Sequence, residues 1–316
     1  MKMENKTAQM SNITNESVFK ILELDYLITA LNYDQRGFCV FDTLLKNKKI
    51  KDVILLDYKK FRPDSNASEI MDFYKRSWSN DIEAISCDNE DDDVMFLNSQ
   101  PITEDNIIGI DITNFCIPDL FRIIFVLKKI KNVKTIYAFY TEPKYYLQHY
   151  HIWENDDSLD NERDFKVLEE YFVSATPENT LLVCFLGFEY LVSKYVSENA
   201  NTKDTVVING FPSYYPKLKD ISLANNYELV STLSKKNIYC STANDPFSAY
   251  NTLMEIQKNY PGYVLNLCVL GTKPMALGAC IYALENEGKV KVSYPIPKTY
   301  KVATSKEASN MWYYVI

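Results

Sequence analysis

Residues 265–284, LNLCVLGTKPMALGACIYAL, join two apolar runs through the short polar turn Gly271-Thr272-Lys273-Pro274. The first run has the length and composition of a buried strand. The second run begins at a proline and is rich in small residues, which is typical of a helix that packs closely on its neighbours. A strand that leads through a tight turn into a helix is the repeating unit of a parallel α/β sheet. This stretch therefore predicts the fold class.

The same alternation of short apolar runs and helical patterns extends along both halves of the chain. In the first half we expect strands at 26–31, 53–58, 82–87, 107–112 and 133–140, and helices near 36–48, 66–79 and 118–131. In the second half we expect strands at 180–186, 205–210, 237–242, 263–269 and 289–294, and helices near 189–199, 222–233, 245–260 and 274–286. The sequence thus predicts an α/β protein of two Rossmann-like lobes, with mainly parallel sheets and helices on both faces.

Chain length and local composition predict where the lobes begin and end. With 316 residues, the chain is about twice as long as a usual single domain. We expect a flexible N-terminus at 1–16, a first lobe at 17–143, a polar linker at 144–177 and a second lobe at 178–316. The order strand, turn, helix, strand recurs in both halves and indicates a diverged duplication, although two unrelated α/β lobes would share this rhythm.

Composition excludes several classes of protein. The net charge of −8 argues against a surface that follows duplex nucleic acid, because such surfaces are strongly basic. No apolar run reaches the length of a membrane span, and the polar N-terminus lacks the apolar segment of a secretory signal. The seven cysteines form no CxxC pair, which favours a reducing compartment. We therefore expect a cytoplasmic protein without contact to membranes.

The turn at 271–274 has two interpretations. Gly271 allows a close approach of the backbone, Thr272 can cap the following helix, and Lys273 adds a positive charge, so the turn could hold a phosphate at the helix N-terminus. The spacing of a Walker loop is missing. The alternative is a tight strand-to-helix connection with an exposed lysine. The small residues that follow, among them Gly278, would let the helix lie close on the sheet.

Gly271, Thr272, Lys273 and Met275, followed by small residues, resemble the signature segment of CARF domains, the CRISPR-associated Rossmann-fold sensors. The order of elements over residues 178–298 is also similar to that family. The resemblance implies a pocket for a nucleotide second messenger, typically a cyclic oligoadenylate, formed by two such domains side by side. It also implies that the four residues of the motif belong to the ligand site.

The same resemblance implies that the loop after the first strand of the second lobe, Gly187, Phe188 and Glu189, lines the pocket. Leu270 stands where the family usually has a first glycine, which makes the approach to the backbone less open. Members of the family commonly carry a fused effector, and no such region is recognisable after residue 300. An effector would then be a separate protein.

The first half departs further from the CARF pattern, because its equivalent turn at 113–118 has neither the glycine nor the lysine. Arg36 and Gly37 stand at the start of a predicted helix and could hold an anion, or Arg36 could form an exposed salt bridge. If both halves share the fold, the chain is an internal pseudo-dimer with one competent and one degenerate half.

Catalytic and metal-binding patterns are weak. The only histidines, His149 and His151, have no third ligand at a recognised spacing, and the acidic run at 88–93 lacks the pattern of a calcium loop. We therefore expect no catalytic residue, no metal and no cofactor.

Three functions fit the sequence. The CARF resemblance implies a sensor or binding protein for a nucleotide-type second messenger in antiviral defence signalling. The alternative is a non-catalytic interaction subunit that acts as a scaffold in a defence complex. A third is a metal-independent phosphodiesterase for cyclic oligonucleotides, in which Thr272 and Lys273 stabilise developing charge. The expected partners are a nucleotide or cyclic oligonucleotide, a separate effector protein and a second copy of the chain.

Overall fold

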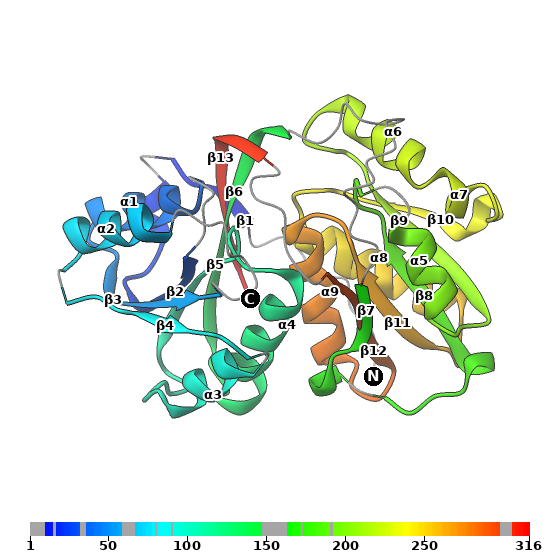
Figure 1. Cartoon of the computed structure of the whole chain (residues 1–316), viewed down its shortest axis with the longest axis horizontal. Coiled ribbons are helices and arrows are strands. Elements are labelled where there is room, and N and C mark those ends of the chain that lie inside the picture. The colour runs from blue at the N-terminus through cyan, green and yellow to red at the C-terminus, as the bar shows by residue number, and fades with distance from the viewer. Residues whose placement is uncertain are drawn as a thin grey trace. The chain divides into compact units, whose positions relative to one another are not determined.

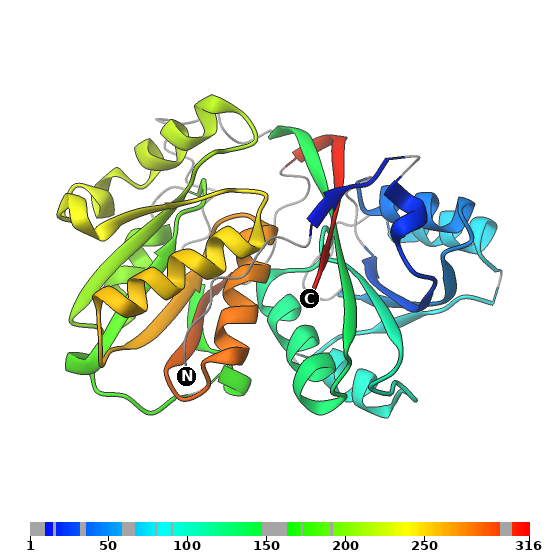
Figure 2. The ribbon, with the colours of Figure 1, turned by 180° about the vertical axis from the view of Figure 1, so that it is seen from behind.

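A computed structural model describes residues 10–14, 17–31, 36–58, 67–79, 81–89, 91–146, 163–171, 173–189, 192–297 and 305–316. The chain divides into two α/β units, each built on one mostly parallel sheet (Figures 1 and 2). We call the first lobe the described residues of 10–146 together with 305–316, and the second lobe the described residues of 163–297. The predicted fold class is confirmed.

The sheet of the first lobe has, among the described residues, the strand order β1-β13-β6-β5-β2-β3-β4. Its strands are β1 (Met10–Asn12), β2 (Leu24–Leu31), β3 (Ile50–Asp57), β4 (Ala84–Ser86), β5 (Ile107–Asp111), β6 (Thr135–Tyr146) and β13 (Ser305–Val315). Its helices are α1 (Gly37–Lys46), α2 (Ala67–Ser77), α3 (Asp92–Ser99) and α4 (Ile117–Phe125), which a π turn at Val126–Ile130 extends; a 3₁₀ turn spans Ser17–Lys20. Strands β2 to β6 are parallel, and β13 is antiparallel to β6.

The sheet of the second lobe has the order β10-β9-β8-β11-β12-β7. Its strands are β7 (Arg163–Val167), β8 (Thr180–Phe185), β9 (Asp204–Gly210), β10 (Ile238–Ser241), β11 (Val264–Val269) and β12 (Val290–Pro297). Its helices are α5 (Val192–Asn199), α6 (Pro216–Asn225), α7 (Tyr227–Val230), α8 (Pro246–Asn259) and α9 (Lys273–Glu285), with 3₁₀ turns at Glu169–Tyr171, Pro177–Asn179 and Lys235–Asn237. Strands β8 to β12 are parallel, and α5 and α8 lie on opposite faces (Figures 1 and 2).

Both sheets place their five parallel strands in the same order. Counted along the chain, the third strand lies beside the second, the second beside the first, the first beside the fourth and the fourth beside the fifth. This is the order of a Rossmann fold, in which the strand order reverses between the first and fourth strands. The reversal lies between β2 and β5 in one lobe and between β8 and β11 in the other. A diverged duplication predicts that both lobes share this strand order, but two unrelated Rossmann lobes would share it as well.

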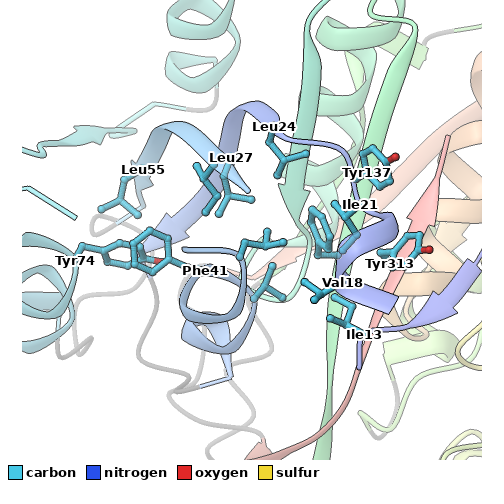
Figure 3. Packing of buried hydrophobic residues seen from close by; sticks show 14 of the residues in the cluster. Ile13, Val18, Ile21, Leu24, Leu27, Phe41, Leu55, Tyr74, Tyr137 and Tyr313 are labelled. Atoms are coloured by element: carbon cyan, nitrogen blue, oxygen red, sulfur yellow. The ribbon is translucent and has the colours of Figure 1, made fainter. Parts of the chain in front are cut away.

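The core of the first lobe contains side chains from both ends of the chain (Figure 3). Leu27 of β2 and Phe41 of α1 are fully buried, and the ring of Phe41 lies 4.7 Å from that of Tyr74 in α2. Tyr313 of β13 belongs to the same cluster, and its neighbour Tyr314 is also buried. The last strand of the chain is therefore part of the first lobe's core.

The predicted boundaries need three corrections. Strand β13 lies in the sheet of the first lobe, although residues 178–316 were assigned to the second. The predicted linker 144–177 contains β7, which pairs with β12, and the N-terminal segment 1–16 contains β1, which pairs with β13. An apolar alternation shows that a segment is a strand, but the edge that it joins is set by contacts far away in sequence.

Helix α9 is buried along almost its whole length, from Pro274 to Leu284. It lies beside α8 (Figures 1 and 2), and Gly278 makes this contact close: a Cβ at that position would lie 2.0 Å from the carbonyl oxygen of Pro246. The glycine predicted to bring the helix close to the sheet instead lies against helix α8. None of the described helices is both long enough and apolar enough to cross a bilayer.

Gly278→Ala should destabilise the second lobe by about 1 to 3 kcal/mol, because the carbonyl of Pro246 is backbone and cannot turn aside as a side chain can. This loss should exceed the gain in helix propensity. Thermal unfolding followed by circular dichroism measures the change. Gly210→Ala is the matched control, since its Cβ would meet the Cβ of Ala243 at an ordinary 3.4 Å. Equal losses in the two variants would contradict the close helix contact.

Candidate functional site

The reversal of strand order in the second lobe brings together two loops that are about 80 residues apart in sequence, which is the ligand-binding position of a Rossmann sheet. The amide of Leu270 donates to the carbonyl of Phe185 at 3.0 Å. A Cβ on Gly187 would lie 2.3 Å from the carbonyl oxygen of Leu270, so only glycine fits there. The predicted loop at Gly187 therefore lies against the predicted turn at Gly271.

Thr272 caps helix α9, as predicted, and its hydroxyl has a second contact. Its Oγ1 accepts a hydrogen bond from the amide of Met275 at 3.4 Å and donates a short one to the carbonyl of Ala243, which follows β10. The hydroxyl of Tyr214 donates to the same carbonyl at 3.2 Å. The side chain of Thr272 thus joins the ends of β10 and β11.

Met275 lies under the turn. Its side chain is fully buried, and its sulfur would lie 3.3 Å from a Cβ on Gly271 and 3.7 Å from one on Gly210. Lys273, the first residue of α9, and Gly271 are both half-buried. Of the four motif residues, Met275 packs in the core, and the backbone of the turn lies nearer the surface.

The loop at 187–189 is held by helix α6. Ser222 Oγ and Asn226 Nδ2 donate to the carbonyl of Gly187 at 3.1 and 2.9 Å, and Asn225 Nδ2 donates to that of Phe188 at 2.6 Å. Glu189 is exposed. Ser222, Asn225 and Asn226, at the C-terminal end of α6, were not predicted as site residues, because their acceptors lie more than 30 residues away in sequence.

An exposed aromatic ring lies at the same edge of the sheet. Phe211, which follows β9, is 49% exposed although its amide donates to the carbonyl of Ser241 at 2.7 Å. The Nζ of Lys219 lies 5.0 Å from the centre of its ring. The edge therefore combines an anchored aromatic ring and a cation with the glycine turn.

In the first lobe, Arg36 differs from the predicted exposed salt bridge. Arg36 is buried, and its Nη1 donates to the carbonyl of Thr141 at 2.9 Å, so it does not form an exposed salt bridge. A Cβ on Gly37 would lie 1.6 Å from Nδ2 of Asn114. That amide donates to the carbonyl of Ala30 at 3.2 Å. Arg36 and Gly37 thus help to pack the strand ends of their own lobe.

A buried polar cluster lies among the ends of β3, β4 and the first turns of α3 and α4. The hydroxyl of Tyr58 donates to Asp93 at 2.9 Å. The guanidinium of Arg122 lies 2.6 Å from Asp119 and 3.8 Å from Asp93. Two buried carboxylates therefore share one guanidinium, and both lie in the first turn of a helix, where negative charge is stabilised.

This cluster changes the protonation of its members. Burial raises the pKa of Asp93 to about 6; the charge of Arg122 opposes this shift and that of Asp119 adds to it. Burial, followed by the charges of Asp93 and Asp119, raises the pKa of the Cys87 thiol to about 12. Cys87 therefore stays protonated at neutral pH and is a poor nucleophile.

In the acidic run at 88–93, Asp92 binds the backbone just before its own helix. Its Oδ2 accepts hydrogen bonds from the amides of Asp88 and Asn89 at 2.9 and 2.8 Å. Within the part of the chain that the structure describes, no group of three or more His, Cys, Asp or Glu side chains could hold a metal ion. His149 and His151 lie outside the described residues.

Comparison with known proteins gives little. No protein-family model matches the chain, and no curated protein matches it. Among solved structures, the cytoplasmic domain of a prokaryotic cation chloride cotransporter is similar at 10% identity, over 89% of this chain and 98% of that one, with a TM-score of 0.27. A TM-score this low gives no argument about function.

The raised pKa of Asp93 predicts that the first lobe becomes more stable as the pH falls from 7 to 5. Its pKa is higher in the folded chain than the ordinary value of 3.8, so the folded state binds the proton more tightly. The free energy of unfolding should therefore gain about 1 kcal/mol from Asp93 as the pH falls from 7 to 5. In Asp93→Asn this gain should disappear, whereas Asp81→Asn, at an exposed carboxylate of the same lobe, should keep it. Urea unfolding at several pH values measures it, and equal slopes in the two variants would contradict the assignment.

Proposed function

We propose that the second lobe binds a nucleotide-type anionic ligand at the edge formed by the loop 187–189 and the turn 271–273. The observation that carries the proposal is the contact of Gly187 with the carbonyl of Leu270, which lies where the strand order reverses. Ligands of Rossmann-like sheets bind beyond the carboxyl ends of the strands at this point. The resemblance to CARF domains supports a nucleotide second messenger, and with it a role in antiviral defence signalling.

The chemistry of this edge suits a phosphate and a base. Helix α9 begins at Lys273, so its first amides and the ammonium group favour negative charge. The ring of Phe211 offers a surface for stacking. The hydroxyl of Thr272 donates a hydrogen bond to the carbonyl of Ala243. This contact favours a structural role for Thr272 over a role in cleaving a phosphodiester. Binding is therefore a better proposal than catalysis.

We do not expect the first lobe to bind a second copy of this anionic ligand. Asp93 and Asp119 place carboxylates of the chain itself in the first turns of α3 and α4, and these would repel a second anion. We therefore expect one ligand per chain.

Lys273→Glu should weaken ligand binding about 100-fold, because the charge next to the ligand is reversed. The melting temperature should stay within about 3 °C of the wild type, since the helix dipole stabilises a carboxylate in the first turn of α9. Isothermal titration with linear and cyclic oligoadenylates measures affinity and stoichiometry.

The matched control is Lys258→Glu. Lys258 is exposed and lies in the last turn of α8, so this variant should bind the ligand as the wild type does. Equal affinity of the Lys273→Glu and Lys258→Glu variants would place the ligand elsewhere, and a stoichiometry of two would contradict the single site.

The scaffold alternative is favoured by exposed aromatic side chains in the second lobe. Phe211, Tyr215 and Tyr227 are 49, 41 and 68% exposed and lie between the end of β9 and the start of α7. Aromatic residues are enriched in protein interfaces. Co-expression with neighbouring gene products, followed by light scattering, tests this function. A complex that forms without a small molecule and is lost in Tyr227→Ser would support it, and the absence of any complex would contradict it.

A further inference from the structure

Each sheet contains one antiparallel strand beside its fifth parallel strand. In the second lobe, β7 pairs with β12, with Lys166 opposite Tyr294. In the first lobe, β13 pairs with β6, with Tyr313 opposite Phe139. The two sheets thus have the same sixth strand, in the same place and in the same direction.

The sequence order of these strands is crossed. Strand β7 follows β6 in the chain but pairs with β12, and β13 follows β12 but pairs with β6. If the repeats are β2–β7 and β8–β13, each repeat gives its sixth strand to the sheet of the other. Strand β1 is not the equivalent of β7, because it is antiparallel to β13 and therefore runs parallel to β6.

A reciprocal exchange of one element is the pattern of a two-fold symmetric dimer, in which each subunit gives what it receives. We propose that this chain is a covalently joined strand-exchanged dimer, in which the second repeat supplies β13 to the edge of β6 and the pairing of these two strands does not depend on the covalent link between them.

The contacts of β13 show what the edge of β6 recognises. Tyr314 is fully buried, and Tyr313 belongs to the first lobe's core. The indole of Trp312 donates to Oε1 of Glu142 at 2.7 Å, and Nδ2 of Asn310 donates to the other oxygen of that carboxylate at 2.9 Å. Backbone pairing with β6 and these side chains together make the contact specific. The β7 strand makes the reciprocal contribution, since Phe165 packs against the second lobe's cluster.

The first test separates the two repeats. A specific protease site is inserted between Ser174 and Ala175 of the full chain, between β7 and β8, and the purified protein is cleaved. The two fragments should elute together in gel filtration, and the melting temperature of the cleaved protein should rise with concentration. Fragments that separate at micromolar concentration while both keep native circular dichroism would overturn the proposal.

The second test asks whether the edge of β6 accepts a strand in trans. A protease site is inserted between Lys298 and Thr299, so that cleavage leaves β13 as a peptide. A fluorescent synthetic peptide of residues 305–316 should then exchange into the cleaved protein. The Tyr314→Asp peptide should bind about 100-fold more weakly, because it would bury a charge. The Ser309→Asp peptide changes an exposed residue and should bind as the native peptide does.

Two results of this second test would overturn the proposal. One is no exchange of the native peptide; the other is equal binding of the Tyr314→Asp and Ser309→Asp peptides. Neither test uses a nucleotide, so a failed proposal of strand exchange is distinguishable from a failed proposal of ligand binding.

Discussion

The parallel pairing of β8 with β11 is the constraint on which the second lobe depends. These strands are central in the sheet, with Cys184 opposite Cys268, and both side chains are fully buried. Their pairing brings the loop at Gly187 against the carbonyl of Leu270, which leaves room only for glycine. The turn into α9 begins at the end of β11, and the end of α6 holds the loop 187–189 that lies against it.

The same strand order leads to different chemistry in the two lobes. At the edge of the second lobe, a glycine turn, a lysine and an exposed phenylalanine lie near a helix start. At the corresponding edge of the first lobe, Asp93, Asp119 and Arg122 form a buried cluster, and Arg36 binds the carbonyl of Thr141. The same strand order therefore surrounds buried charged side chains in the first lobe and leaves the turn at 271–273 near the surface in the second lobe.

Local patterns predicted most of the elements, although they missed α3 and the start of α6 at Pro216. The apolar run before Gly271 and the proline after Lys273 identified β11 and α9, and Thr272 was recognised as a cap because its side chain acts on its own helix. The buried cluster around Asp93 could not be predicted. Its members come from residues 58, 93, 119 and 122, and only the sheet order brings them together. The same reason explains why the burial of Arg36 was not predicted, since its acceptor is 105 residues away.

The sequence by itself determined that the chain alternates strands and helices, where its turns lie and which turn combines a glycine, a helix cap and a lysine. These features depend on residues within a few positions of each other, so periodicity and capping are enough to find them. Only the tertiary structure decided which strands are neighbours, that β13 completes the first sheet, and that Met275 is buried. Strand pairing and burial arise from contacts between distant segments, and a one-dimensional pattern carries no record of which segments meet.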